Sequence, residues 1–484
     1  MLSYLGFFIG YVNMLWLFPY AFRPEEIGLI RLMLSLAAIF SIMASFGGPQ
    51  VATRFFPYFA ESFPRRLIFF RILIGFAFIG VVILSFCFIF FYDTITNLYS
   101  EKSPLLLSYF WYILPLAASL ILYGILEAFV IVQGYPLVPT LLREVYTRAA
   151  ITMAITAFIA STVSLSGFLY IVCILYCFAP VLLFIYGYRE HIIPLAGSAG
   201  TISKTEMKEI GHFGAYLFIG NASAVILANI DSVVLSAYAG LTSAGIYGIA
   251  FFLAVIIEIP KRSLSQVLIP MVVKANKDHD IKALDVLYKK SSLNQFIIGA
   301  AIFLIVWLNI DGIFSLIPHG DIYREGKWVV LLIAFAKLFD MLTGINAEII
   351  GTSQYYRIEL FIGFIINLVG VSLNIILIPL YGLNGAACAV FVSVFLYNSI
   401  RFIVIAILMK IQPFTKNTIV AGIYALLTYG VISMIPSFQG TIIDIGLRTI
   451  FIGVIFGGLI LGLHVSEDIS RTFHKIVVRF YSHG

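Results

Sequence analysis

The chain has 484 residues, of which 61% are hydrophobic and 11% are charged, and its mean hydropathy is +1.03. A soluble domain is typically about 45–50% apolar and about 25% charged, so the composition excludes a soluble globular protein. The formal net charge of +6 is explained by the positions of the basic residues between membrane spans, and we expect no nucleic-acid partner.

Apolar runs recur along the whole chain, each about 20 residues long and therefore able to cross about 30 Å of hydrocarbon as a helix. They lack the alternation of membrane strands, so helices are expected. The predicted spans are 2–22, 27–46, 67–91, 106–132, 141–163, 166–188, 212–238, 243–262, 292–316, 327–350, 358–378, 383–408, 416–435 and 444–463. The sequence therefore predicts an all-α integral membrane protein with about fourteen transmembrane helices.

The connections between the spans alternate in charge, with about 23 of the 30 Lys and Arg residues on one side of the membrane. The positive-inside rule places that side and both termini in the cytoplasm. The first span lacks a basic leading segment, which indicates that a few cytoplasmic residues precede Met1. The longest connections, 189–211 and 270–291, are too short for a soluble catalytic domain. We therefore expect a transporter and not an enzyme.

The chain also contains an internal repeat. Gly28 follows the first span and Gly245 follows the seventh, and each precedes an apolar helix that ends near a proline, Pro57 or Pro270. An even number of spans separates the copies, so the halves are predicted to be parallel repeats with the substrate path between them. The predicted parts are a six-helix bundle at 1–188, a cytoplasmic linker at 189–211, a second six-helix bundle at 212–409, and two extra helices with a tail at 410–484.

Three motifs resemble the polysaccharide-transporter branch of the multidrug/oligosaccharidyl-lipid/polysaccharide flippase superfamily. They are the turn Pro24-Glu-Glu-Ile-Gly28, the segment Arg54-Phe-Phe-Pro57 and the turn Ile378-Pro-Leu-Tyr-Gly-Leu-Asn-Gly-Ala-Ala387. The third is the most specific. Together with two sets of six spans and an extra pair, the resemblance covers essentially the whole chain.

This resemblance implies a flippase of the bacterial inner membrane that moves undecaprenyl-pyrophosphate-linked oligosaccharide units for O-antigen (lipopolysaccharide) or capsule synthesis. It also implies a cavity between the halves, lined mainly by spans one, two, seven and eight. The expected partners are the lipid-linked oligosaccharide, membrane lipid and, transiently, a glycan polymerase and a chain-length regulator. No cofactor or metal is expected, although transport by this family is compatible with proton or Na⁺ coupling.

Charged residues inside the membrane are costly and mark the candidate sites. Lys337 and Asp340 lie near the middle of span ten, one turn apart. In one interpretation Lys337 binds a pyrophosphate or an acidic sugar, with Asp340 as its partner or as a proton acceptor. In the other, the charge is part of a structural ion pair between packed helices, and Lys337 ties span ten to a neighbour.

Spans two, seven and eight hold further candidates. Asp231 either binds a coupling cation or proton, or lies hydrated at the outer interface, while Asn221 is a polar candidate for the substrate path. Glu258 precedes Lys261 and Arg262 by three and four residues, which is typical of an interfacial ion pair. Arg31 either extends to the outer surface or faces the cavity mouth.

The remaining candidates lie in the first half of the chain. Arg54 and Arg143 end helices on the inner side, where the positive-inside rule accounts for them and where they are also candidates for the substrate. Asn13 either lines the cavity or bonds across helices. Glu127 has no evident partner and is grouped with the coupling candidates.

Two other functions stay open. A cation-coupled drug exporter of the same superfamily would normally have twelve spans, so the extra pair argues against it. A membrane-embedded polysaccharide polymerase or glycosyltransferase needs a large external loop or a close acidic pair. Here Asp311, Asp321 and Glu325 are scattered without a motif.

Overall fold

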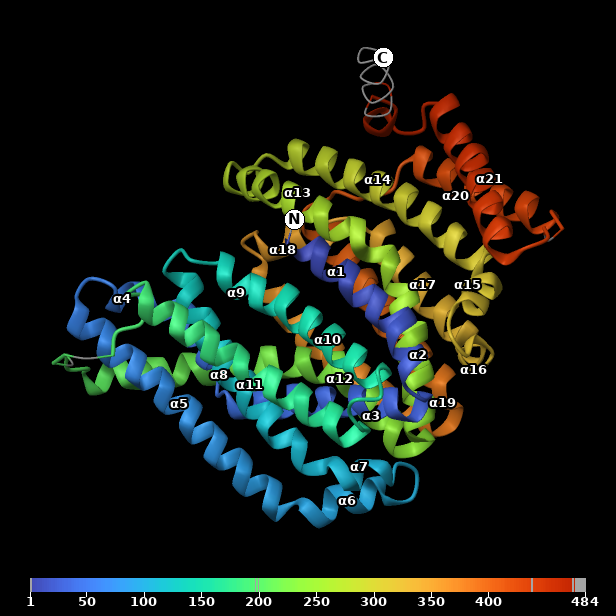
Figure 1. Ribbon diagram of the computed structural model, residues 1–484. Coiled ribbons are helices and arrows are strands. Elements are labelled where there is room, and N and C mark those ends of the chain that lie inside the picture. The colour runs from blue at the N-terminus through green and yellow to red at the C-terminus, as the bar shows by residue number, and fades with distance from the viewer. Residues whose placement is uncertain (1, 196, 199, 437, 472–473, 475–484) are drawn as a thin grey trace, which may run out of the picture. The chain divides into compact units, whose positions relative to one another are not determined.

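The computed structural model describes residues 2–195, 197–198, 200–436, 438–471 and 474. These residues form helices joined by short connections, and no strand occurs among them (Figure 1). The all-α fold is thus confirmed, and the fourteen predicted spans all correspond to helical segments. Eight segments are individually long and apolar enough to cross a membrane. The number of these segments is lower than fourteen because two of the segments contain a pair of spans each, while other spans are short or interrupted.

The helices group into two compact units. Unit 1 comprises Met1–Gly248 with Asn374–Gly382, and unit 2 comprises Ile249–Leu373 with Leu383–Gly484. Unit 1 therefore includes the seventh span, and unit 2 includes the C-terminal pair of helices. The division into two six-helix bundles at 1–188 and 212–409 stays a prediction.

Unit 1 contains the helices of the first seven spans and the beginning of the eighth. They are α1 (Leu2–Val12), the π-helix η1 (Asn13–Leu17), α2 (Phe18–Ala21), α3 (Pro24–Ala44), α4 (Gly48–Phe59), α5 (Phe63–Phe90), α6 (Tyr92–Ser100), α7 (Leu105–Tyr109), η2 (Phe110–Tyr112), α8 (Ile113–Val132), α9 (Leu137–Leu141), the π-helix η3 (Leu142–Tyr146), α10 (Thr147–Ile159), α11 (Leu165–Arg189) and most of α12 (Lys204–Val255).

Unit 2 contains the helices of the later spans. They are η4 (Ile256–Glu258), α13 (Ile259–Lys277), α14 (Ile281–Leu308), α15 (Ile310–Leu316), α16 (Gly320–Tyr323), η5 (Arg324–Gly326), α17 (Lys327–Leu342), α18 (Asn346–Gly351), most of α19 (Tyr356–Leu408), α20 (Lys416–Ser433) and α21 (Thr441–Gly462).

Two long helical segments each turn back at a single glycine. Within α12, Gly240 has φ 86° and ψ 167°, and within α19, Gly382 has φ 55° and ψ −128°. Side chains with a Cβ atom rarely adopt such angles, so glycine allows the tight reversal. α12 therefore supplies spans seven and eight, and α19 supplies spans eleven and twelve. Gly382 lies in the most specific of the three sequence motifs.

Aromatic packing organises the interior of unit 1. α8 contacts α3, α4, α5 and α11. Its fully buried Phe129 lies with its ring centre 5.5 Å from that of Phe56 on α4 and 5.0 Å from that of Phe70 on α5. Lipid is as apolar as these rings, so close packing between helices, more than exclusion from water, favours this arrangement.

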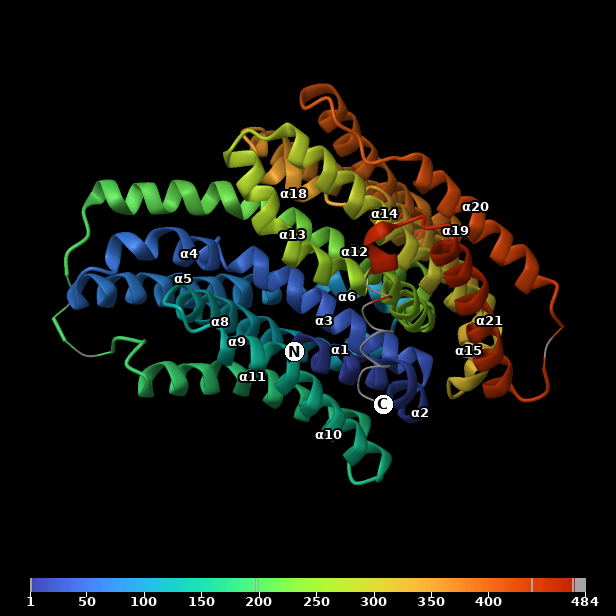
Figure 2. The same ribbon diagram turned by 90° about the horizontal axis from the view of Figure 1, so that it is seen from above.

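In unit 2 the corresponding central helix is α14. It packs against α17, α20 and α21 through a cluster that includes Leu293, Ile297 and Phe456. α20 and α21 lie side by side in both views (Figures 1 and 2). One face of the extra C-terminal pair therefore packs against α14, while much of the surface of the pair is exposed.

Two predicted connections are shorter than expected. The predicted linker 189–211 becomes helical at Lys204, where α12 begins. Most of the predicted loop 270–291 is also helix, because α13 continues to Lys277 and α14 begins at Ile281. Charged residues end an apolar run without ending the helix, so hydropathy placed these boundaries wrongly.

Candidate functional site

The start of α3 and the second arm of α12 approach each other closely within unit 1. α3 begins with Pro24 at its first helical position, a position that suits proline. A Cβ atom on Gly28 would lie 1.9 Å from the carbonyl oxygen of Leu241, and one on Gly245 would lie 2.0 Å from that of Pro24. Each glycine thus faces the residue four positions before the other. The two glycines that mark the sequence repeat meet in a reciprocal contact.

Arg31 extends from α3 beside this contact. Its Nε donates a hydrogen bond to the Ser232 hydroxyl at 2.7 Å, and a terminal nitrogen lies 3.5 Å from the Asp231 carboxylate. Its guanidinium also lies 5.2 Å from the ring centre of Tyr247. The Asp231 side chain is 6% exposed and that of Arg31 is 19% exposed. Asp231 is therefore buried and paired, and Arg31 turns inward.

Gly248 provides the space for this arginine. A Cβ atom on Gly248 would lie only 3.0 Å from a terminal nitrogen of Arg31. The backbone N–H of Ser232 donates to the second oxygen of Asp231 at 2.7 Å. Residues of α12 on both sides of Gly240 thus surround the partly buried guanidinium of Arg31 on α3. Sequence spacing gave no indication of this pairing.

Asn13 takes part in a second polar network of unit 1. Its amide donates to the carbonyl oxygen of Arg148 at 3.1 Å, and its oxygen accepts from the Thr152 hydroxyl at 2.8 Å. It lies in the π-helix η1, and Arg148 follows the π-helix η3, a type of turn frequent at functional sites. Of the two predicted roles for Asn13, the structure shows the bond across helices.

Glu127 is also paired, contrary to the sequence analysis. A terminal nitrogen of Arg143 lies 2.6 Å from its carboxylate, and Nε of Arg143 lies 3.2 Å from Glu144. Arg148 in turn lies 3.2 Å from the other oxygen of Glu144. Charges therefore alternate along the contact of α8 with η3 and α10. Arg143 lies within this series, between Glu127 and Glu144, and is half-exposed.

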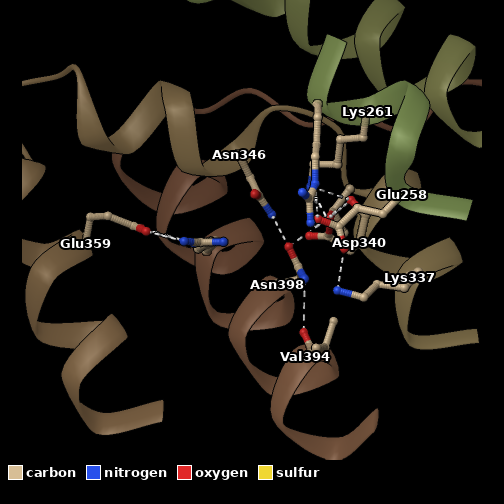
Figure 3. Close-up of polar contacts among 11 residues, drawn as sticks. Glu258, Lys261, Lys337, Asp340, Asn346, Glu359, Val394 and Asn398 are labelled. Carbon is tan, nitrogen blue, oxygen red and sulfur yellow. Dashed lines mark hydrogen bonds and ion pairs between the residues drawn. The ribbon is translucent and has the colours of Figure 1, made fainter. Parts of the chain in front are cut away.

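The charged residues of unit 2 exchange the partners that were predicted for them (Figure 3). Lys337 pairs with Glu258 and not with Asp340. The Asp340 carboxylate lies 2.6 Å from the ammonium group of Lys261. The local pair between Glu258 and Arg262 does form, at 3.3 Å. The predicted pairing of Lys337 with Asp340 is wrong because the carboxylate at the end of η4 is closer than the one on the same helix.

These four residues, Glu258, Lys261, Lys337 and Asp340, are hereafter called the charge quartet. Their side chains are between 14% and 19% exposed. Two carboxylates and two ammonium groups neutralise one another, which reduces the cost of burial. The quartet connects η4 and α13 to α17.

A buried amide lies beside the quartet. Asn398 accepts hydrogen bonds from Asn346 at 2.9 Å and from Thr343 at 3.1 Å, and it donates to the carbonyl oxygen of Val394 at 3.0 Å (Figure 3). Asn398 and its two donors are almost completely buried. Such satisfied polar groups fix the relative register of the helices that carry them.

A buried ion pair between the two arms of α19 was missed by sequence reasoning. The Nε atom of Arg401 lies 3.0 Å and 3.2 Å from the two oxygens of Glu359. Its guanidinium is also 3.5 Å from the ring centre of Tyr397. The two residues lie at similar distances before and after Gly382, and this symmetry about a predicted turn was the available signal.

Two candidates lie outside these networks. Asn221 is exposed on α12. Arg54, on α4, lines a cavity of about 880 Å³ that is considered below. Within the described residues no three His, Cys, Asp or Glu side chains are placed to hold a metal ion.

The fold resembles solved membrane transporters. The chain aligns with the lipid II flippase MurJ in an inward closed conformation at a TM-score of 0.67 and 13% identity, over 92% of this chain and 98% of that one. It aligns with a multidrug resistance MATE family transporter of the MOP superfamily, in an inward-facing conformation, at 0.64 and 12% identity, over 84% and 94%. The chain therefore shares the fold of these two transporters.

Sequence comparison then gives the family. Residues 1–276, more than half of the chain, match the family described as polysaccharide biosynthesis protein, and the chain belongs to it. It is 29% identical over 196 residues to the capsular polysaccharide biosynthesis protein CapF of Staphylococcus aureus. It is also 25% identical over 316 residues to an uncharacterized membrane protein of Methanocaldococcus jannaschii.

These two alignments cover 39% and 62% of this chain, and 48% and 61% of the respective relatives. The chain thus spans about half and about three fifths of the lengths of the curated relatives it matches. The resemblance stated from the three motifs is confirmed at the level of family and fold.

Proposed function

We propose that this protein is a flippase that moves polyprenyl-pyrophosphate-linked oligosaccharide units across the bacterial inner membrane during the synthesis of surface polysaccharide such as capsule or O-antigen. The observation that carries the proposal is the family match over residues 1–276, which extends through the first seven spans and the eighth. The likeness of the fold to a lipid II flippase supports it.

The buried charges support transport of a polar group through the membrane. A transporter needs polar side chains at membrane depth, where each one is costly, and such residues mark substrate and ion pathways. In this proposal Arg31, Arg54, Arg143, Lys337, Asn13 and Asn221 serve the substrate path. Asp231, Asp340, Glu258 and Glu127 are the candidates for proton or Na⁺ coupling. A glycan polymerase and a chain-length regulator are its proposed transient partners.

Reconstitution tests the proposal directly. Purified protein in proteoliposomes should move a fluorescent polyprenyl-pyrophosphate oligosaccharide from one leaflet to the other, measured by its accessibility to a membrane-impermeant quencher. Protein-free vesicles and vesicles with a lipid-linked dye that lacks the glycan provide the controls. Movement of small cationic drugs with no movement of the lipid-linked glycan would instead establish a small-molecule exporter.

The proposed topology has its own test. With both termini in the cytoplasm, reporter fusions after Ser100, Ile322 and Gln439 should read as external, and fusions after Gly200 and His279 should read as internal. The loop around His279 carries several lysines, so the positive-inside rule applies most strongly there. An external signal at His279 would overturn the orientation.

A further inference from the structure

A cavity in unit 1 lies apart from the buried charge networks. Its volume is about 880 Å³, and its walls are the end of α4 and the beginning of α12. Two kinds of side chain line it. The aromatic ones include Phe55, Tyr58 and Phe213, and the basic ones are Arg54, Lys208 and His212.

Arg54 is held by an aromatic ring at this cavity. Its guanidinium lies 5.8 Å from the ring centre of Phe213, which in turn packs edge-on against Phe55 at 5.4 Å. A guanidinium stacked on a ring keeps its N–H donors directed outward in its own plane, where they match the oxygens of a phosphate group. In the part of the chain that the structure describes, no carboxylate forms an ion pair with Arg54.

One of the two carboxylates that line the cavity has other partners. Glu206 pairs with Arg65 and accepts a hydrogen bond from the backbone N–H of Ser203 at 2.8 Å. The bond from Ser203, followed by the charge of Arg65, holds the pKa of Glu206 below its usual range. Glu206 therefore stays ionised and is compensated by Arg65. Of the two lining carboxylates, Glu209 then remains as the negative charge that faces the three basic side chains of the cavity.

The position of the cavity indicates the kind of ligand. α4 ends at Phe59, and the apolar spanning helix α5 begins at Phe63. In the predicted topology the cavity thus lies where a membrane span meets the aqueous face that carries most of the basic residues. Tyr58 is 59% exposed, so its aromatic ring is accessible beside the basic side chains of the cavity. An amphiphile with a phosphorylated head group fits both features.

We propose that this cavity, formed by Arg54, Lys208 and His212 with the rings of Tyr58 and Phe213, binds the phosphate groups of a membrane amphiphile. The guanidinium of Arg54 binds two phosphate oxygens, Lys208 adds a flexible positive charge, and the rings contact the first apolar or sugar unit. The proposal of a phosphate site in this cavity rests on this geometry alone. Its assignment to the lipid that is transported, as a first docking position, rests on the proposed function.

Equilibrium binding tests the site without requiring transport. The full chain in phosphatidylcholine nanodiscs is titrated with radiolabelled farnesyl pyrophosphate. The Arg54→Gln, Lys208→Gln double variant should bind it about tenfold more weakly or worse, since each charge-assisted hydrogen bond is worth a large part of a tenfold step. The Arg66→Gln, Lys204→Gln double variant is the matched control, because it removes the same charge from the same face but neither residue lines the cavity.

Competition distinguishes the sources of the phosphate. Displacement by inorganic pyrophosphate but not by phosphatidylglycerol assigns the site to polyprenyl pyrophosphates. Equal displacement by phosphatidylglycerol assigns it to acidic membrane lipid. Unchanged affinity in a double variant that melts at the wild-type temperature would overturn the site, as would an equal loss in the control. Intact binding without flipping in proteoliposomes would contradict the proposed function and leave the site in place.

Discussion

Arg31 in unit 1 and the charge quartet in unit 2 are held in different ways. In unit 1 Arg31 is bound at 2.7 Å by the neutral hydroxyl of Ser232, while Asp231 is 3.5 Å away. In unit 2 each carboxylate of the charge quartet contacts its own ammonium group, as at 2.6 Å in the Asp340 pair. Charge-assisted hydrogen bonds are typically about 2.7–2.9 Å long, so the Arg31–Asp231 pair is long and the ion pairs of the charge quartet are short.

This difference separates two roles for a charge in a membrane helix. A tight, neutralised set acts as a cross-link between helices, and removal of one member leaves its partner uncompensated. The longer ion pair of Arg31 with Asp231 is weaker, so less electrostatic energy is lost when the two side chains move apart. We therefore expect substitutions in the quartet to reduce folding, and substitutions at Arg31 to affect function more than folding. The predictions below test this contrast.

The largest effect is expected for Asp340→Ala. It leaves the ammonium group of Lys261 buried without its carboxylate, and the expected loss of stability is about 3 kcal/mol. Thermal denaturation in detergent, followed by fluorescence-detected size exclusion, measures it. The double variant Lys261→Met, Asp340→Leu should recover most of the loss, because an apolar pair often replaces a buried ion pair at little cost. If Asp340→Ala melts like the wild type, the quartet is no cross-link.

The same logic applies to Lys337. A structural Lys337 predicts less folded protein for Lys337→Ala, with recovery in Lys337→Met, Glu258→Leu. A substrate-binding Lys337 predicts normal protein yield with loss of export. Full export by the recovered double variant would contradict the substrate role.

A smaller effect is expected for Gly245→Ala in unit 1. The new methyl group would lie 2.0 Å from the carbonyl oxygen of Pro24, so the backbones must separate. Overpacking of this kind costs about 2 kcal/mol. Gly453→Ala in α21 is the matched control, because a Cβ atom there meets nothing within 4 Å. Equal melting temperatures for the two variants would show that the reciprocal contact is not tight in solution.

The smallest effect on stability is expected for Arg31→Lys. Lysine keeps the charge but cannot reproduce the hydrogen bond from Nε to Ser232 or the stacking on Tyr247, and the expected loss is about 1 kcal/mol. A double-mutant cycle with Ser232→Ala isolates the hydrogen bond. A coupling energy near zero would show that Ser232 does not hold the arginine.

The fold was largely predictable because the thickness of the bilayer sets the length of an apolar helix. Fourteen apolar runs corresponded to helices, and the motif containing Gly382 located a real reversal of the chain. The ends of the helices were less predictable. α12 begins at Lys204 and α13 ends at Lys277. A helix continues into water as long as its residues favour it, whereas hydropathy records only where the lipid ends.

The pairing of the charges was not predictable from one sequence. Spacing shows which side chains share a face of one helix, as with Lys337 and Asp340, but not which helix lies opposite. Glu127 had no visible partner because Arg143 belongs to the next span. Glu359 and Arg401 went unnoticed for the same reason. Tertiary contacts determine which charged residues pair. The repeat of Gly28 and Gly245 was the one long-range relation that was visible in the sequence.

The reciprocal glycine contact has the form of a two-fold interface, in which each side presents the same surface to the other. Three residues beyond these glycines the symmetry ends, because Arg31 stands at one position and Gly248 at the other. A dimer of two identical halves would carry the same residue at both positions. It would then have either two arginines in the space available for one, or two glycines and no cation. A chain with a different residue at each of the two positions places a single, partly buried cation there. The site is therefore asymmetric, although the glycine contact beside it is reciprocal.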